Sequence, residues 1–163
     1  MGLHRNESGS LLLSKPGKMR WDYSEPRGKT FVMDGHYGWS YVPGDAQAQR
    51  ISAKQMDDLR SPLRLLLGHA QLRRELVDIA VTPDASGGAV IVGGPIVPGV
   101  GFTKLMLRVL GDGSIKELTA SEVDGATTKF TFTDTQDNVP TSDADFVFAP
   151  PMGVPIVDGL PPI

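Results

Sequence analysis

Side chains that could act in catalysis or bind a metal are few in this sequence and lie far apart. The three histidines, His4, His36 and His69, share no metal-ligand spacing. The chain contains no cysteine, which excludes disulfides, thiolate metal sites, a catalytic thiol and a lipidated cysteine within it. We therefore expect a protein that is not an enzyme and that uses no cofactor and no metal ion.

Two short matches to catalytic motifs are incomplete. Gly28-Lys29-Thr30 is similar to the end of a phosphate-binding loop, but Tyr23 occupies the position of the first glycine of that loop. Gly38-Trp39-Ser40-Tyr41 departs from a nucleophile elbow at Val42. An enzyme with a dispersed site in a lipocalin-like cup is the weakest of the alternatives that these residues leave open.

Large apolar side chains are more informative than the polar ones. Met19, Trp21 and Tyr23 alternate with polar residues, which is the pattern of a strand with one apolar face. The alternation returns in two further predicted strands, and a short leucine-rich helix follows them. An ordinary packed core would explain these residues, but methionines together with aromatic rings also suit an apolar ligand cavity. The candidate cavity residues are Met19, Trp21, Tyr23, Phe31, Met33, Trp39 and Tyr41 on the strands and Leu63, Leu66 and Leu67 on the helix.

A cation stands beside this apolar set in the sequence. Lys15 precedes Pro16 at the end of a predicted strand, which places it near the rim of a curled sheet. We expect Lys15 at the mouth of the cavity, where it could meet a lipid headgroup or a partner protein. A lysine that is merely solvated is the alternative.

Charge is distributed unevenly along the chain. Residues 1–75 hold 12 Lys/Arg and 8 Asp/Glu (12 − 8 = +4), and residues 76–163 hold 4 and 11 (4 − 11 = −7). Two faces of one solvated surface would explain this asymmetry, and so would a docking surface for a partner. The net charge of −3 supplies no basic field for nucleic acid.

The elements that position these residues are mostly short strands joined by tight turns. Turn signals at Pro16-Gly17, Asp34-Gly35 and Asp124-Gly125 separate alternating segments. Helical segments are expected only at Lys54–Leu59, from Pro62 to Gly68 and at Gln71–Leu76. The predicted strands comprise Ser10–Ser14, the segments around Trp21, Phe31 and Trp39, then Val77–Thr82, Ala89–Val92, Thr103–Leu110, Ser114–Glu122, Thr127–Thr133 and the tail Phe146–Pro151.

Nine or ten antiparallel strands form a sheet large enough to curl into a barrel or to split. The fold class is therefore mainly β: a curled antiparallel sheet that forms an unclosed β-barrel covered by short helices. The central position of the helices in the sequence suits a lid over one mouth of that sheet. We expect residues 1–163 to form a single domain.

Several segments, in this order, resemble the LolA family of periplasmic outer-membrane lipoprotein carriers. The first is the strand–turn–strand block Ser8–Tyr23, and Glu25-Pro26, Met33-Asp34-Gly35 and Trp39–Pro43 follow it. Further similar segments are Ser61–Gly68, Asp124-Gly125, Thr128–Phe132 and Phe146–Val154. Members of the family have a signal peptide, a long helix and a strand before the Gly9 block, so the resemblance implies a LolA-like domain that lacks the N-terminal helix and first strand. The family's rim arginine before the proline is Lys15 here, which keeps the charge but loses the planar fork.

The resemblance implies a periplasmic chaperone that binds the acyl chains of lipoproteins in the apolar cavity and carries lipoproteins from the inner to the outer membrane. Its partners would be acylated lipoproteins, an inner-membrane lipoprotein-releasing transporter and an outer-membrane acceptor. No nucleic acid and no stable membrane insertion are expected. A monomer is expected, or a dimer that forms through an unpaired edge strand. The alternative function is a lipid- or lipoprotein-sensing regulatory module of the same fold.

Overall fold

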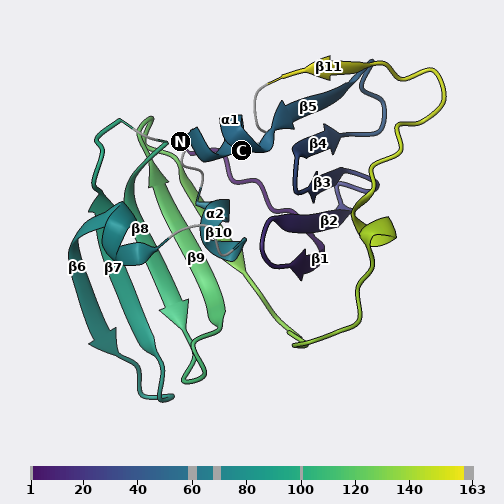
Figure 1. Ribbon diagram of the computed structural model, residues 1–163. Helices are drawn as coiled ribbons and strands as arrows, with labels where there is room; N and C mark the ends of the chain where they lie inside the picture. Colours follow the sequence, from purple (N-terminus) through teal and green to yellow (C-terminus); the bar gives the residue numbers. More distant parts are fainter. Residues whose placement is uncertain (1, 59–61, 68–70, 100, 160–163) are drawn as a thin grey trace. The chain divides into compact units, whose positions relative to one another are not determined.

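Antiparallel strands dominate the computed structural model, which describes residues 2–58, 62–67, 71–99 and 101–159 (Figure 1). The chain divides into two compact units, one formed by Met1–His69 with Pro140–Ile163 and the other by Ala70–Val139. Each unit contains one sheet, and the helices are short. Over the described ranges the fold is therefore mainly β with few short helices and no closed barrel, as the strand patterns predict.

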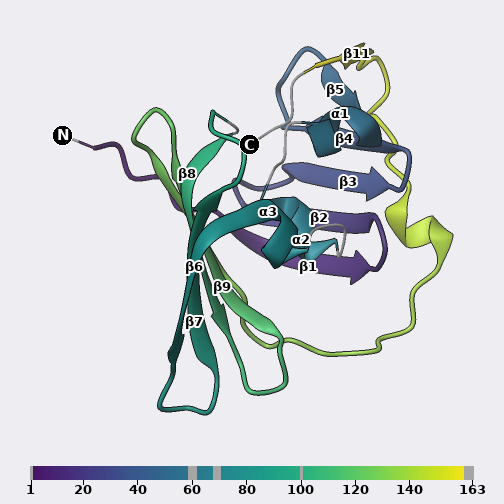
Figure 2. The same ribbon diagram turned by 60° about the vertical axis from the view of Figure 1, so that its left-hand side comes forward.

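The first unit contains a six-stranded sheet in the order β1-β2-β3-β4-β5-β11. Figure 2 shows β1 to β4 side by side in this order. Gly17 and Gly35 have φ of 89° and 98° in the two tight connections, a conformation that glycine adopts without steric cost. The strands are β1 (Ser8–Ser14), β2 (Lys18–Glu25), β3 (Thr30–Asp34), β4 (Tyr37–Tyr41), β5 (Ala48–Ser52) and β11 (Ile156–Asp158).

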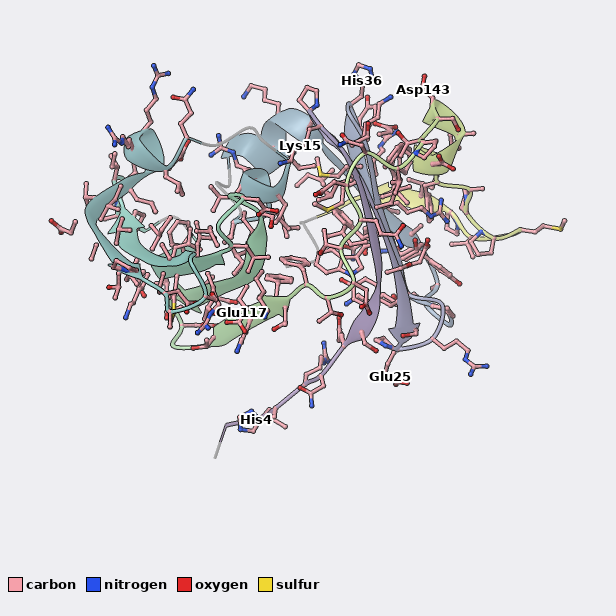
Figure 3. All side chains as sticks on the ribbon, turned by 90° about the horizontal axis from the view of Figure 1, so that it is seen from below. His4, Lys15, Glu25, His36, Glu117 and Asp143 are labelled. Carbon is pink, nitrogen blue, oxygen red and sulfur yellow. The ribbon has the colours of Figure 1, made fainter. Side chains whose placement is uncertain are left out.

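Different segments cover the two faces of this sheet. Figures 1 and 3 show α1 (Ala53–Asp58) and α2 (Leu63–Leu66) on one side and η1 (Asp143–Phe146) on the other. Contacts of α1 with β4 and β5, and of η1 with β2 and β3, agree with this view. The sheet is thus buried on both faces at its centre, where Phe31, Val32 and Met33 are at most 2% exposed.

The second unit is a five-stranded antiparallel meander in the order β10-β9-β8-β7-β6. One face is apolar and buried, with Leu105, Leu107 and Leu118 at 0–2% exposure. The opposite face carries charged cross-strand neighbours, including Arg108 directly opposite Glu117. Its elements are α3 (Leu72–Glu75), β6 (Leu76–Pro83), β7 (Ala89–Pro95), β8 (Phe102–Val109), β9 (Ile115–Glu122) and β10 (Thr127–Thr131).

The expected elements agree with these strands except at the ends of the first sheet. The predicted strand Phe146–Pro151 is wrong, because the segment ends a 3-10 turn and then runs without strand pairing up to two prolines. The strands β5 and β11 had no sequence prediction. The helices expected near Lys54–Leu59 and Gln71–Leu76 are present as α1 and α3, whereas Leu59 and the predicted helix stop at Gly68 lie outside the described residues.

Candidate functional site

Cross-strand pairing sorts the predicted cavity residues onto the two faces of the first sheet. Met19 lies opposite Met33, and Trp21 lies opposite both Leu11 and Phe31. Directly opposed residues of an antiparallel pair project to the same face. We name this the helix-side face, and it carries Leu11, Leu13, Met19, Trp21, Tyr23, Phe31, Met33, Gly38 and Ile51.

Trp39 and Tyr41 project to the opposite face, which corrects the expectation that they share one wall with Trp21. Their cross-strand partners are Val32 and Thr30, whose side chains alternate with those of Phe31 and Met33. Four residues lie between Met33 and its partner Gly38. Because this number is even, odd-numbered residues of β3 pair with even-numbered residues of β4. The short connection at Asp34-Gly35 therefore puts the odd-numbered side chains of β3 and those of β4 on opposite faces.

The helix-side face is buried at its centre and half-buried toward its edge. Met19, Met33 and Ile51 are 0%, 2% and 4% exposed, whereas Trp21 is intermediate. A Cβ on Gly38 would lie 3.2 Å from Ile51 Cγ2, so glycine allows the neighbouring side chains to close over β4. Ile51 could not be foreseen, because β5 was missed. Leu11 and Leu13 were not named as candidates, although the period of two in the predicted strand Ser10–Ser14 would have placed them on one face.

A charged cluster bounds the aromatic part of this face. The rings of Trp21 and Tyr23 stack with centroids 5.7 Å apart, and Lys29 Nζ lies 4.5 Å from the Tyr23 centroid. Lys29 also pairs with Glu7 at 2.7 Å. Burial, assisted by the negative charge of Glu7, raises the pKa of Tyr23 to about 12. Tyr23 is therefore neutral at physiological pH and offers an aromatic surface rather than a base.

The three predicted lid leucines are all buried. Leu63, Leu66 and Leu67 are 1%, 5% and 1% exposed, and the Leu67 amide donates to the Leu63 carbonyl at 3.2 Å. The ribbon places α2 on the helix-side face (Figures 1 and 3). The leucines and the strand residues Met19 and Phe31 thus belong to the same side of the first unit.

Lys15 is exposed in the connection between β1 and β2. Figure 3 shows Lys15 and His36 at one end of the sheet and Glu25 at the other. Lys15 therefore stands at the end of the sheet opposite the cluster that contains Tyr23 and Lys29. This position agrees with a rim residue, although its role as a cavity mouth stays a prediction.

The opposite face, which we name the strap-side face, is covered by residues 142–148, the strap. Trp39 Nε1 donates to Asp34 Oδ2 at 3.2 Å, and the Trp39 ring stacks on Phe148 with centroids 5.8 Å apart. Phe146 is 2% exposed, and the Arg20 guanidinium donates to the Val147 carbonyl at 3.4 Å. Trp39 is thus engaged with the strap and not with the helices.

The described residues include no group of three or more His, Asp or Glu side chains that could hold a metal ion. Within the same residues, no helix is both long enough and apolar enough to cross a membrane.

Comparisons with known proteins agree with this geometry. The family model described as "Outer membrane lipoprotein carrier protein LolA" matches residues 3–149. An outer-membrane lipoprotein carrier protein of Dechloromonas aromatica is 28% identical over 155 residues, which are 94% of this chain and 72% of that protein. The protein of the same name in Chromobacterium violaceum is 28% identical over 160 residues, 97% of this chain and 75% of its own length.

A solved structure supports the fold as well. An uncharacterized conserved protein from Thermus thermophilus superposes with a TM-score of 0.52 at 13% identity, covering 87% of this chain and 75% of that one. At this identity the likeness concerns the fold alone. On the match to the family model over most of its length, the chain belongs to the LolA family of outer-membrane lipoprotein carrier proteins.

Proposed function

We propose that this protein is a non-enzymatic carrier that binds the acyl chains of lipoproteins and takes lipoproteins across the periplasm to the outer membrane. The match of residues 3–149 to the lipoprotein-carrier family carries the proposal. The apolar helix-side face and its leucine helix support it, because they supply the kind of surface that an alkyl chain needs.

The free energy of exposing acyl chains to water explains why such cargo needs a carrier. Each CH₂ group that leaves water gains about 0.8 kcal/mol, so a lipoprotein with several long chains does not cross an aqueous compartment unaided. Met19, Trp21, Tyr23, Phe31 and Met33 would contact the chains from the sheet. Leu63, Leu66 and Leu67 would cover them, and Lys15 would stand at the mouth.

Release must be as easy as uptake for a carrier. For this the short leucine helix α2 (Leu63–Leu66) has to move away from the sheet, so that a closed and an open state exchange. We infer that α2 opens to admit acyl chains from an inner-membrane lipoprotein-releasing transporter and opens again at an outer-membrane acceptor.

The two tryptophans provide a direct test, because they lie on opposite faces of the same sheet. The Trp39→Phe variant reports on Trp21 alone, and the Trp21→Phe variant reports on Trp39 alone. We expect a bromine-labelled fatty acid, whose heavy atom quenches tryptophan fluorescence on contact, to quench Trp21 and to leave Trp39 unquenched. A triacylated peptide should displace the fatty acid and restore the fluorescence.

The outcomes separate the proposal from its alternatives. Saturable quenching of Trp21 that the triacylated peptide reverses would support acyl-chain binding on the helix-side face. Absence of quenching at Trp21 by the fatty acid, together with no binding of the triacylated peptide, would refute the carrier proposal. Quenching of Trp39 alone would refute the assignment of the site to the helix-side face.

A further inference from the structure

A second candidate site lies on the strap-side face, where the first unit has a groove of about 430 Å³. This volume falls within the range of small-ligand pockets. Residues from the sheet form one wall, and residues from the strap form the other. The lining residues are Lys18, Asp34, His36 and Trp39 of the sheet and Asp143, Phe146, Val147 and Phe148 of the strap.

The wall that the strap contributes is formed before any ligand arrives. Lys18 pairs with Asp143, and the Arg20 guanidinium donates to the carbonyls of Asp145 and Val147 at 3.4 Å each. The Ser142 amide donates to the Asp145 carboxylate at 2.8 Å in a capping box. A preorganised wall lowers the ordering cost of binding.

Two carboxylates give the groove its negative character. Asp34 accepts hydrogen bonds from the amides of His36 and Tyr37, each at 2.8 Å, and from the Trp39 indole. Partial burial acts to raise the pKa of Asp34, but the bonds from Tyr37, His36 and Trp39 outweigh it and hold the pKa below its ordinary value. The bond from Lys18 lowers the pKa of Asp143. Both groups are therefore anionic at neutral pH, so the lining holds two carboxylates against the ammonium group of Lys18.

The chain around the groove adds negative charge. Within the first unit, residues 140–159 contain three aspartates, namely Asp143, Asp145 and Asp158, and no Lys, Arg or Glu. An anionic ligand would meet this field unfavourably, and a cationic one would be attracted to it.

The aromatic rings of this face already accept a guanidinium group. Arg50 Cζ lies 4.9 Å from the Tyr37 centroid and 5.6 Å from the Trp39 centroid. Such contacts combine cation–π attraction with apolar contact along the side-chain stem. Val147, which is 59% exposed, extends the apolar part of the groove.

We propose that this groove docks a basic peptide segment of a partner protein, with an arginine or lysine set between the carboxylates and apolar neighbours on Trp39, Val147 and Phe148. The groove and the helix-side face lie on opposite sides of the sheet, since Trp39 and Phe31 project in opposite directions. The partner can therefore bind while the helix-side face is occupied. This inference goes beyond acyl-chain binding and does not depend on it.

A fluorescein-labelled octapeptide of alternating arginine and leucine is a suitable probe, with a glutamate–leucine octapeptide as its control. We expect saturable binding of the basic peptide, measured by fluorescence anisotropy, and none of the acidic one. Asp143→Asn should raise the dissociation constant about three- to fivefold, the upper part of the range for an exposed ion pair. Asp137→Asn removes the same charge from a residue outside the groove and should change the constant by less than about 1.5-fold, the lower limit of that range.

Other outcomes would overturn the proposal. Equal weakening by the Asp137 and Asp143 substitutions would show attraction to the acidic chain in general and not docking in the groove. Absence of binding by the basic peptide would refute it as well. Competition between the peptide and the fatty acid would refute the proposal that they bind on separate faces. If the fatty acid fails to bind and the peptide binds, the proposed function fails and the docking proposal stands.

Discussion

At the scale of single residues, Tyr23 marks the boundary between apolar surface and charge on the first sheet. Its ring stacks on Trp21, while Lys29 and Glu7 form an ion pair beside it. Burial is the larger cause of its raised pKa, and the Glu7 carboxylate is the smaller one. The phenol hydroxyl therefore resists ionisation, both because it is buried and because the Glu7 carboxylate is close.

The raised pKa of Tyr23 predicts a loss of stability in alkaline solution. The ordinary value is 10.0 and the folded value is about 12, so the folded state keeps the proton that the unfolded state has lost in between. The contribution to the free energy of unfolding is complete below pH 10 and declines as the pH rises toward 12. Tyr23→Phe should remove this decline when urea unfolding is followed from pH 8 to pH 11.5. A decline of equal size in Tyr23→Phe would assign it to other groups.

At the scale of elements, the β3–β4 connection decides which residues share a face. The Asp34 carboxylate accepts hydrogen bonds from two backbone amides of the turn and from the Trp39 indole. These bonds fix the connection of four residues between Met33 and Gly38. Sequence alternation identifies each strand separately, because it depends on local spacing. The relation between the faces of two strands depends on the length of the connection, which is why Trp39 was expected beside Trp21.

Replacing Asp34 should weaken this connection in a pH-dependent way. Asp34→Ala removes the acceptor of three hydrogen bonds, and we expect the free energy of unfolding at pH 7 to fall by about 1 to 3 kcal/mol. Because the folded pKa is depressed, the wild-type advantage is present above the ordinary value of 3.8 and lost as the pH falls through the folded pKa. Asp34→Asn retains a carbonyl acceptor and should lose less at pH 7. A difference between wild type and Asp34→Ala that persists unchanged at pH 3 would contradict the role of the carboxylate.

The pairing of β1 with β2 requires a residue without a side chain at position 9. A Cβ on Gly9 would lie 2.1 Å from the Asp22 carbonyl oxygen, where the register of the pair shifts. Gly9→Ala therefore pushes the backbones of β1 and β2 apart. We expect faster amide hydrogen exchange in Leu11 and Leu13 as β1 detaches. Gly44→Ala is a matched control, since nothing lies within 4 Å of the added Cβ, although its positive φ carries a conformational cost of its own. Unchanged exchange in β1 of Gly9→Ala would contradict this steric requirement.

At the scale of the whole molecule, local patterns predicted the strands better than the sheets. The alternating segments and glycine turns indicated a mainly β chain, and the structure confirms it. Consecutive strands pair throughout both sheets except where β11 joins β5, and the division falls between β5 and β6, which the alternation within single strands does not reveal. β11 pairs in parallel with β5 across more than a hundred residues, and β5 itself is a short, partly polar segment. The leucines of α2 were predictable because their helical spacing is local, whereas the strap was mistaken for a strand because Phe146 and Phe148 alternate.

The two units permit a test of where cargo binds in the molecule. Leu66 of α2 and Leu118 of the second sheet are both buried, at 5% and 0% exposure, so Leu66→Ala and Leu118→Ala should each cost about 2 to 5 kcal/mol. An apolar cavity left by a deleted leucine can take up an apolar ligand. If acyl chains lie under α2, a saturating fatty acid should recover part of the loss in Leu66→Ala, because ligand binding to the folded state adds stability by mass action. Thermal unfolding with and without the fatty acid measures this recovery. Equal recovery of stability in the two variants would contradict an acyl site under α2. The fatty acid would then stabilise the variant of the second sheet as much as the variant of the helix that is proposed to cover the acyl chains.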